Sequence, residues 1–230
     1  IMRILEGNHL DRWGNCNRNS SDVGLSTCIA LGLYRRFDRN FGRLLRSIHD
    51  ESLERTTNGE GKLLNHSVEA LRKLDAGKGE QIPTLAEVVE LIGNQAFINI
   101  ELKGFDTASL VMKLVRMLDR KRFKKEQFII SSYLFSELSL VHELDPEIRL
   151  GVIADEYPTI ALEFADEIDA YSFHPSFSLL DKALVDDAHD AGMKVYVHTV
   201  NDLEKINHSR ALGVDGVFTD YPDRVIEYMR

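Results

Sequence analysis

Residues 97–118, FINIELKGFDTASLVMKLVRML, contain the pattern that decides the fold. Residues 97–102 are mostly apolar with two isoleucines and lie between Gly93-Asn94 and Gly104, which predicts a strand. Residues 107–118 carry apolar side chains at helical spacing, which predicts a helix. A strand followed directly by a helix is the repeating unit of proteins built on a parallel sheet.

The same alternation continues to the end of the chain. Further strands are predicted at residues 128–132, 149–153, 170–173, 194–198 and 216–219, and further helices at 136–144, 159–164, 180–191, 202–212 and 223–229. This order implies a parallel sheet with right-handed crossovers, and the nearly continuous apolar strands fit a sheet that is buried on both faces. A doubly wound open sheet is the competing architecture. Because no Gly-x-Gly-x-x-Gly follows any of these strands, the pattern favours a closed α/β barrel.

The composition narrows the class of protein and of partner. A chain of 230 residues, 43% hydrophobic, is long enough for one α/β barrel domain, so we expect a single domain. The net charge of -9 argues against a nucleic-acid partner, which needs a basic face. It does not exclude a small anionic substrate, because a bound metal ion can outweigh the global field.

The chain also has the features of a cytoplasmic protein. No apolar run approaches the roughly 18 residues of a membrane span, and residues 1–5 lack the apolar core of a signal peptide. Cys16 and Cys28 are the two cysteines, and we expect free thiols. We therefore expect a cytoplasmic location and no membrane span.

In an α/β barrel the chemistry lies at the carboxyl ends of the strands. The polar residues that end the predicted strands are His49-Asp50, Glu101 with Lys103, Ser131-Ser132, His174, His198 and Asp220. Glu101 and Lys103 are two residues apart and so face the same side of their strand. Two interpretations stay open for this pair: a metal-ligating carboxylate beside a phosphate-binding lysine, or an ion pair at the barrel rim.

The histidines and aspartates at strand ends also have two interpretations each. His49 could donate a proton to a leaving alkoxide near neutral pH, or it could cap a loop, and His174 is interpreted in the same way. Asp202 is expected to cap the helix that it starts. Asp220 could face the mouth of the barrel, although capping is the expected role.

Several motifs together resemble those of the glycerophosphodiester phosphodiesterase family, and they follow one another in the family's order over about 180 residues. They are HDESLERTTNG at 49–59, IPTLAEV at 82–88, NIELK at 99–103, SSY at 131–133, HP at 174–175, HTVN at 198–201 and GVDGVFTDYP at 213–222. A series of motifs in order is far more specific than any one of them.

The resemblance implies a TIM-like (β/α)8 barrel with a small insertion after the second strand, here at about residues 52–81. It also implies a divalent cation, Mg or Ca, and hydrolysis of small-molecule glycerophosphodiesters to glycerol 3-phosphate and an alcohol. By residue match, His49 would protonate the leaving group, Glu101 would ligate the metal and Lys103 would contact phosphate. His198 stands where the family usually has a tryptophan, which assigns it to the substrate pocket.

The N-terminal part departs from the family pattern. His9 takes the place of the first catalytic histidine, but Leu10-Asp11 follows it instead of Arg-Gly. Residues 36–38 take the place of a Glu-x-Asp metal pair. Asp38 could still ligate metal, whereas Arg36 would repel it. No good strand signal precedes Leu44.

Three accounts of residues 6–47 stay open. The segment could belong to a divergent, inactive barrel, to a barrel with remodelled or degenerate first βα units, or to a reading-frame artefact in the gene sequence. Residues 1–61 hold nine arginines and no lysine, which marks a shift in composition. Arg36 favours a second hypothesis about function, a catalytically impaired barrel that binds a phosphodiester or a protein partner.

Overall fold

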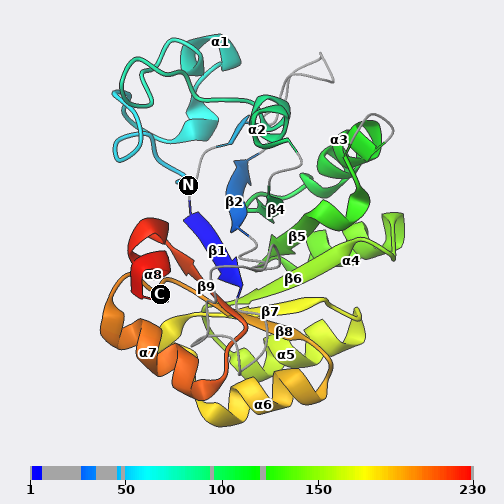
Figure 1. Cartoon of the computed structure of the whole chain (residues 1–230). Helices are drawn as coiled ribbons and strands as arrows, with labels where there is room; N and C mark the ends of the chain where they lie inside the picture. Colours follow the sequence, from blue (N-terminus) through cyan, green and yellow to red (C-terminus); the bar gives the residue numbers. More distant parts are fainter. Residues whose placement is uncertain are drawn as a thin grey trace. The chain divides into compact units, whose positions relative to one another are not determined.

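The computed structural model describes residues 2–6, 27–34, 46–47, 50–93, 96–119 and 123–228. Its strands are β1 (Met2–Glu6), β2 (Thr27–Tyr34), β3 (Arg46–Ser47), β4 (Phe97–Leu102), β5 (Phe128–Ser132), β6 (Arg149–Ala154), β7 (Ser172–Pro175), β8 (Lys194–Val197) and β9 (Gly216–Thr219). Its helices are α1 (Val68–Leu71), α2 (Leu85–Ile92), α3 (Ala108–Asp119), α4 (Phe135–Leu144), α5 (Pro158–Glu167), α6 (Lys182–Asp190), α7 (Leu203–Leu212) and α8 (Pro222–Tyr228). The predicted alternation from residue 97 onward is confirmed, with boundaries that differ by a few residues (Figure 1).

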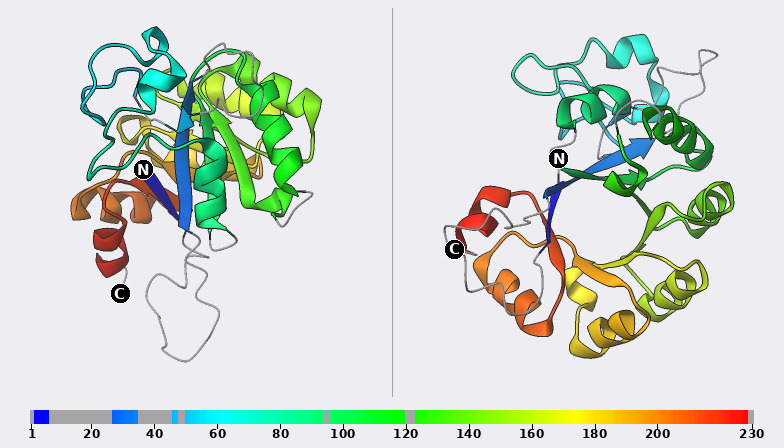
Figure 2. Two further views of the ribbon diagram at one scale, coloured as in Figure 1. Left: turned by 90° about the horizontal axis from the view of Figure 1, so that it is seen from above. Right: turned by 45° about the vertical axis from the view of Figure 1, so that its right-hand side comes forward.

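The chain divides into two compact units, residues 1–30 with 149–230 and residues 31–148. In the first unit, β6, β7, β8 and β9 pair in parallel in the order of the sequence. Helices α5, α6 and α7 cover one face of these strands (Figure 2). The strands are buried along nearly their whole length because the helices cover one face and side chains fill the other.

The ends of α7 show why this helix begins and stops where it does. Asp202 accepts a hydrogen bond from the Lys205 amide at 2.9 Å, which confirms the predicted N-terminal cap. Gly213 ends the helix with a φ of 89°, a left-handed conformation that other residues adopt only at a cost. The strand β9 can therefore start within a few residues of the helix end.

In the second unit, β4 and β5 pair in parallel, with Ile100 opposite Ile130 and Glu101 opposite Ser131. The helices α3 and α4 follow these strands and pack against each other. Before them, Thr84 and Glu87 form a reciprocal capping box that starts α2. This helix begins within the IPTLAEV motif.

Residues 50–84 form a small segment with its own apolar cluster, made of Leu53, Leu63, Leu71 and Ile82. Its only regular elements among the described residues are α1 and the short 3-10 turn η1 (Leu63–Asn65). The insertion expected at residues 52–81 lies within this segment. That it is an insertion into the barrel stays a prediction.

The expectation that no strand precedes residue 44 is wrong. Strands β1 and β2 pair antiparallel, with Ile4 opposite Cys28, and β1 also pairs antiparallel with β9. Strand β2 pairs antiparallel with β3 through Leu33 and Ser47. Residues 27–34 read TCIALGLY, a mostly apolar run. These antiparallel pairings differ from the parallel units of a (β/α)8 barrel. They lie in the same part of the chain for which degenerate first βα units were one of the three explanations.

None of the helices in the described ranges has both the length and the hydropathy that crossing a membrane requires.

A buried carboxylate connects helices α3 and α4 of the second unit. Glu137, on α4, is 5% exposed and accepts hydrogen bonds from the backbone amides of Asp106, Thr107 and Ala108 at 2.6, 2.9 and 2.8 Å. These amides form the start of α3, where no carbonyl within the helix is available to them. The negative charge also opposes the positive end of the helix dipole.

We expect Glu137→Ala to lower the free energy of unfolding by about 3 kcal/mol, because three buried amides lose a charged acceptor. Urea denaturation would measure it as a lower midpoint at unchanged slope. Glu143→Ala, an exposed site on the same helix, is the matched control and should change stability little. Equal midpoints for the two variants would contradict the capping role.

Candidate functional site

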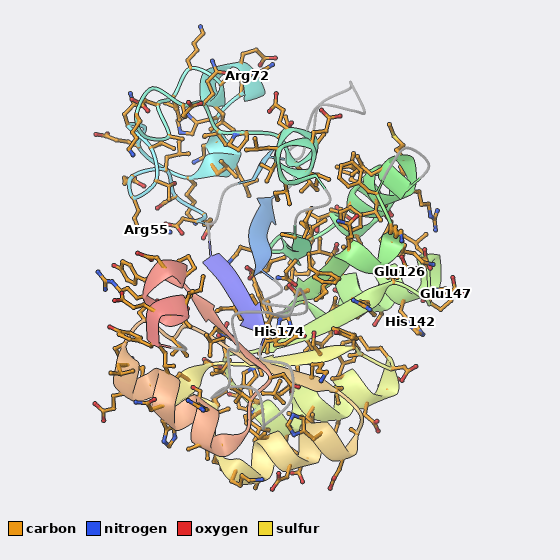
Figure 3. All side chains as sticks on the ribbon, in the orientation of Figure 1. Arg55, Arg72, Glu126, His142, Glu147 and His174 are labelled. Atoms are coloured by element: carbon orange, nitrogen blue, oxygen red, sulfur yellow. The ribbon has the colours of Figure 1, made fainter. Side chains whose placement is uncertain are left out.

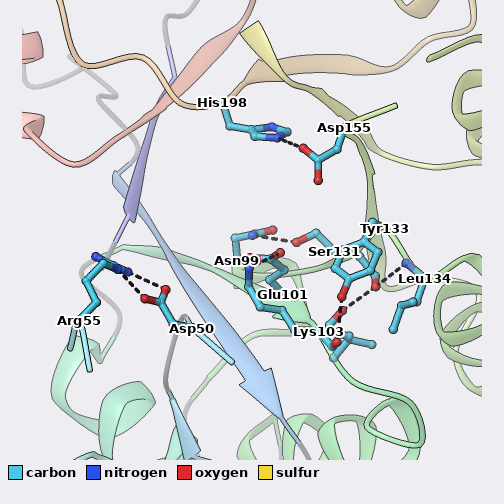
Figure 4. A network of polar contacts seen from close by, with 12 residues as sticks. Asp50, Arg55, Asn99, Glu101, Lys103, Ser131, Tyr133, Leu134, Asp155 and His198 are labelled. Atoms are coloured by element: carbon cyan, nitrogen blue, oxygen red, sulfur yellow. Dashed lines mark hydrogen bonds and ion pairs between the residues drawn. The ribbon is translucent and has the colours of Figure 1, made fainter. Parts of the chain in front are cut away.

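The carboxyl end of β4 carries the pair that the sequence singles out. Glu101 and Lys103 lie 3.1 Å apart, measured from Oε1 to Nζ, and each side chain is 14% exposed (Figure 4). The two side chains therefore form the ion pair that was one of the two interpretations of this motif. An ion pair without metal does not test the first interpretation, and the metal and phosphate roles stay predictions.

A third polar side chain lies on the same strand. Asn99 precedes Glu101 by two residues, so the two project from the same face of β4. Asn99 is 1% exposed, and its Nδ2 donates to the Oγ of Ser131 on β5 at 2.9 Å. Its Oδ1 is buried and has no hydrogen-bond partner.

The last residue of β5 and the residue after it fix the end of β4. The Ser132 hydroxyl donates to the Leu102 carbonyl at 2.6 Å and accepts from the Leu134 amide at 2.9 Å. The Tyr133 hydroxyl donates to the Lys103 carbonyl at 3.1 Å. The SSY motif thus holds the backbone on which Glu101 and Lys103 stand.

The HDESLERTTNG motif is described from its second residue onward. Asp50 accepts two hydrogen bonds from Arg55, at 2.5 and 2.7 Å from Nε and Nη2. This two-point contact is the strongest geometry that an arginine and a carboxylate can form. It fixes the start of the segment that follows His49.

In the other compact unit, His198 follows β8 and Asp155 follows β6. The Nε2 of His198 lies 2.9 Å from the Oδ1 of Asp155, and the ring packs edge-on against Phe218. Carboxyl ends of parallel strands meet at one edge of a sheet, which explains how residues 43 positions apart come together. The carboxylate orients the imidazole. The role of His198 in substrate binding stays a prediction.

Asn201 connects two of the motifs in the same unit. Its Oδ1 accepts from the Thr219 hydroxyl at 3.1 Å and from the Asp220 amide at 2.9 Å, while its Nδ2 donates to Asp220. The HTVN turn and the strand end at TDYP are thereby held together. Asp220 thus contacts another loop, and α8 begins two residues later at Pro222. The expected capping role of Asp220 stays a prediction.

The interpretation of His174 as a loop cap is wrong. His174, labelled in Figure 3, lies within β7 and is fully buried. Its ring contacts the rings of Tyr196 and Phe218. Its Nε2 forms a hydrogen bond with the Ser172 hydroxyl at 2.8 Å, and its Nδ1 has no partner. Burial, and to a smaller extent the charge of the nearby His198, together lower the pKa of His174 from 6.5 to about 3, so the ring is neutral at physiological pH.

Three of the predicted site residues, His9, Asp38 and His49, lie outside the described residues. Their roles therefore stay predictions. Within the described ranges, no three His, Cys, Asp or Glu side chains converge as a metal-binding group.

Sequence reasoning did not single out Asn99, Asp155 or Asn201. For Asn99 the signal was available, because it lies two residues before Glu101 on an otherwise apolar strand. Asp155 directly follows a predicted strand, and the rule that barrel chemistry lies at strand ends could have found it. Asn201 carried no such signal, since its partners lie on a different loop.

Comparisons with known proteins identify the family of this chain. The pattern of the glycerophosphoryl diester phosphodiesterase family matches residues 47–224. The chain belongs to this family. The resemblance carried by the sequence motifs is thereby confirmed.

Named relatives support the family assignment. A glycerophosphodiester phosphodiesterase of Caldanaerobacter subterraneus subsp. tengcongensis is 35% identical over 193 residues, which cover 80% of this chain and 79% of the relative. One from Bacillus altitudinis is 31% identical over 196 residues, covering 80% of each chain. Both belong to the enzyme class that the motifs predict.

Solved structures of the family have the same fold. A phosphodiesterase from Oleispira antarctica, solved with its product sn-glycerol-3-phosphate, has a TM-score of 0.76 at 26% identity, over 90% of this chain and 85% of that one. One from Galdieria sulphuraria has a TM-score of 0.75 at 22% identity, over 90% of this chain and 86% of that one, and shows the fold alone. The alternating α/β architecture of this chain is therefore shared with solved structures of the family.

The neutral, buried His174 makes stability depend on pH. In the unfolded chain its pKa returns to about 6.5, so the unfolded state binds more protons than the folded state between pH 6.5 and 3. The stabilisation is complete above pH 6.5 and is lost as the pH falls, by at most about 1.4 kcal/mol per pH unit. We expect the free energy of unfolding to fall over this window.

Urea denaturation at several pH values would measure the effect. His174→Leu removes the titrating group, so its stability should fall less steeply between pH 6.5 and 4 than that of the unaltered protein. His208→Gln, at an exposed site, is the control and should leave the slope unchanged. A His174→Leu slope equal to that of the unaltered protein would rule out this origin of the pH dependence.

Proposed function

We propose that this protein hydrolyses glycerophosphodiesters to glycerol 3-phosphate and an alcohol with the help of a divalent cation, Mg or Ca. The observation that carries the proposal is the Glu101–Lys103 pair at the end of β4, in a chain that belongs to the family. The product found in the Oleispira antarctica phosphodiesterase supports the substrate class. We further propose that residues 52–81 are a small insertion into the barrel after its second strand.

The residues present fit a hard cation. Glu101 offers a partly buried carboxylate, and the unpartnered Oδ1 of Asn99 offers an uncharged oxygen on the same face of β4. Mg²⁺ and Ca²⁺ prefer oxygen ligands of both kinds. Asp38 would be a further ligand by residue match. The cation, when bound, neutralises phosphate charge and polarises the phosphorus-oxygen bond.

The chain's own residues supply the remaining chemistry. Lys103 places a positive charge at a phosphate oxygen, where it stabilises the charge that grows in the transition state. A water oxygen adds to phosphorus, and the bond from phosphorus to the alcohol oxygen breaks. His49 gives its proton to that departing oxygen, while His9 takes the proton of the water. His198 would contact the substrate.

A second function has one observation in its favour. Arg36 occupies the place of a metal carboxylate in the family pattern, and a cation there repels another. A catalytically impaired family member would then bind a phosphodiester or a protein partner without turning it over. The two functions differ in whether metal and turnover are measurable.

Glu101→Gln should lower hydrolysis of glycerophosphocholine by about 100-fold or more, because the amide is a poorer cation ligand than the carboxylate. The release of glycerol 3-phosphate would be measured with and without a chelator. Glu143→Gln, at an exposed carboxylate, is the control. In parallel, millimolar Ca²⁺ or Mg²⁺ should raise the melting temperature of the unaltered protein. No measurable turnover, together with a melt unmoved by either metal, would favour the second function. Turnover that withstands the chelator would contradict the dependence on a cation.

Lys103→Met should separate phosphate contact from metal binding. Without the ammonium group, Glu101 loses its ion-pair partner, so metal affinity should stay equal or rise. Hydrolysis should nevertheless fall by about 10²–10³-fold, as when one transition-state contact is removed. Calorimetric metal titration and turnover would be compared on one preparation. Unchanged turnover would exclude Lys103 as a phosphate contact.

A further inference from the structure

Among the described residues, the buried side-chain polar atoms without a hydrogen-bond partner are Thr56 Oγ1, Asn99 Oδ1 and His174 Nδ1. A buried polar group without a partner costs about 1–3 kcal/mol. The neutral ring of His174 is enclosed by aromatic side chains, and Thr56 lies away from β4 in the sequence. Of these three groups, Asn99 Oδ1 belongs to the strand that carries the candidate site.

The surroundings of Asn99 determine which of its atoms is available. Its Nδ2 is occupied by the hydroxyl of Ser131, which is fully buried on the neighbouring strand. This contact holds the amide plane and leaves Oδ1 directed away from Ser131. The group without a partner is thus an acceptor, which attracts a cation or a donor and repels a phosphate oxygen.

Charge along β4 leads to the same conclusion. Asn99, Glu101 and Lys103 project from one face, so an uncharged oxygen lies next to a carboxylate that Lys103 partly neutralises (Figure 4). A second carboxylate at position 99 would be costly to bury when no cation is bound. An amide oxygen adds a ligand without adding a charge to desolvate.

We infer that Asn99 is an oxygen ligand of the divalent cation at Glu101, either directly or through one bound water. The inference rests on the proposed function, because it requires that Glu101 gathers a cation. It assigns to the strand a second cation-binding residue of different chemistry. It also gives the buried Oδ1 a partner in the loaded protein.

The test compares two substitutions of similar size. Asn99→Leu removes the oxygen, and Asn99→Asp keeps an oxygen but removes the amide donor. The full chain would be stripped of metal with a chelator and titrated calorimetrically with CaCl2 and with MgCl2. We expect Asn99→Leu to weaken binding about 10–100-fold and Asn99→Asp to bind at least as tightly as the unaltered protein.

Two further measurements separate metal binding from folding. Ser131→Ala removes the partner of Nδ2 but leaves Oδ1, so it should weaken metal binding less than Asn99→Leu does. The melting temperature of metal-free Asn99→Leu measures the effect on folding by itself, because the substitution removes the unpartnered oxygen but also takes the amide donor from the buried Ser131 hydroxyl. A lower metal-free melting temperature with unchanged metal affinity would mean a purely structural role and would overturn the inference.

The inference and the proposed function fail in different ways. If the unaltered protein binds metal but Asn99→Leu binds it equally well, or if Asn99→Asp binds as weakly as Asn99→Leu, only the inference is overturned. If the unaltered protein binds neither Ca²⁺ nor Mg²⁺, no cation is bound at Glu101, and both the inference and the proposed function are overturned. Binding that follows the expected order of the variants supports both.

Discussion

Strand β4 has to accommodate three polar side chains on one face of a segment that is otherwise buried. Asn99, Glu101 and Lys103 share that face because side chains alternate along a strand, and water reaches little of it. Burying polar groups is favourable only when they are paired. Glu101 and Lys103 pair with each other, and Ser131 takes one side of the Asn99 amide, which leaves a single oxygen. The candidate site follows from this incomplete pairing.

The rest of the second unit holds that strand in place. Ser132 and Tyr133 bind the carbonyls of Leu102 and Lys103, so the backbone at the strand end is fixed from β5. On the other side, Glu137 caps the helix that follows the strand. A site whose charged groups are held by rigid neighbours needs little rearrangement to receive a ligand, which is a condition for efficient electrostatic catalysis.

The N-terminal part of the chain departs from the family in sequence and in strand direction. By residue match, Arg36 would stand in the place of a metal carboxylate. Strands β1, β2 and β3 pair antiparallel where a (β/α)8 barrel has parallel strands. If this substitution removes one oxygen ligand, a site at β4 depends more on the ligands that β4 itself supplies. The buried Oδ1 of Asn99 is the uncharged oxygen available there.

The sequence by itself determined the strand and helix order from residue 97 onward and Glu101 and Lys103 as a pair, because both depend on local periodicity or spacing. It also indicated the family, through the resemblance of its motifs. It also determined the Asp202 cap, which involves a contact three residues away. Only the tertiary structure decided the burial of His174, the contact of His198 with Asp155, and the unpartnered oxygen of Asn99. Those features depend on side chains from other strands. The sequence around a polar residue does not show whether such a side chain will form a hydrogen bond with it.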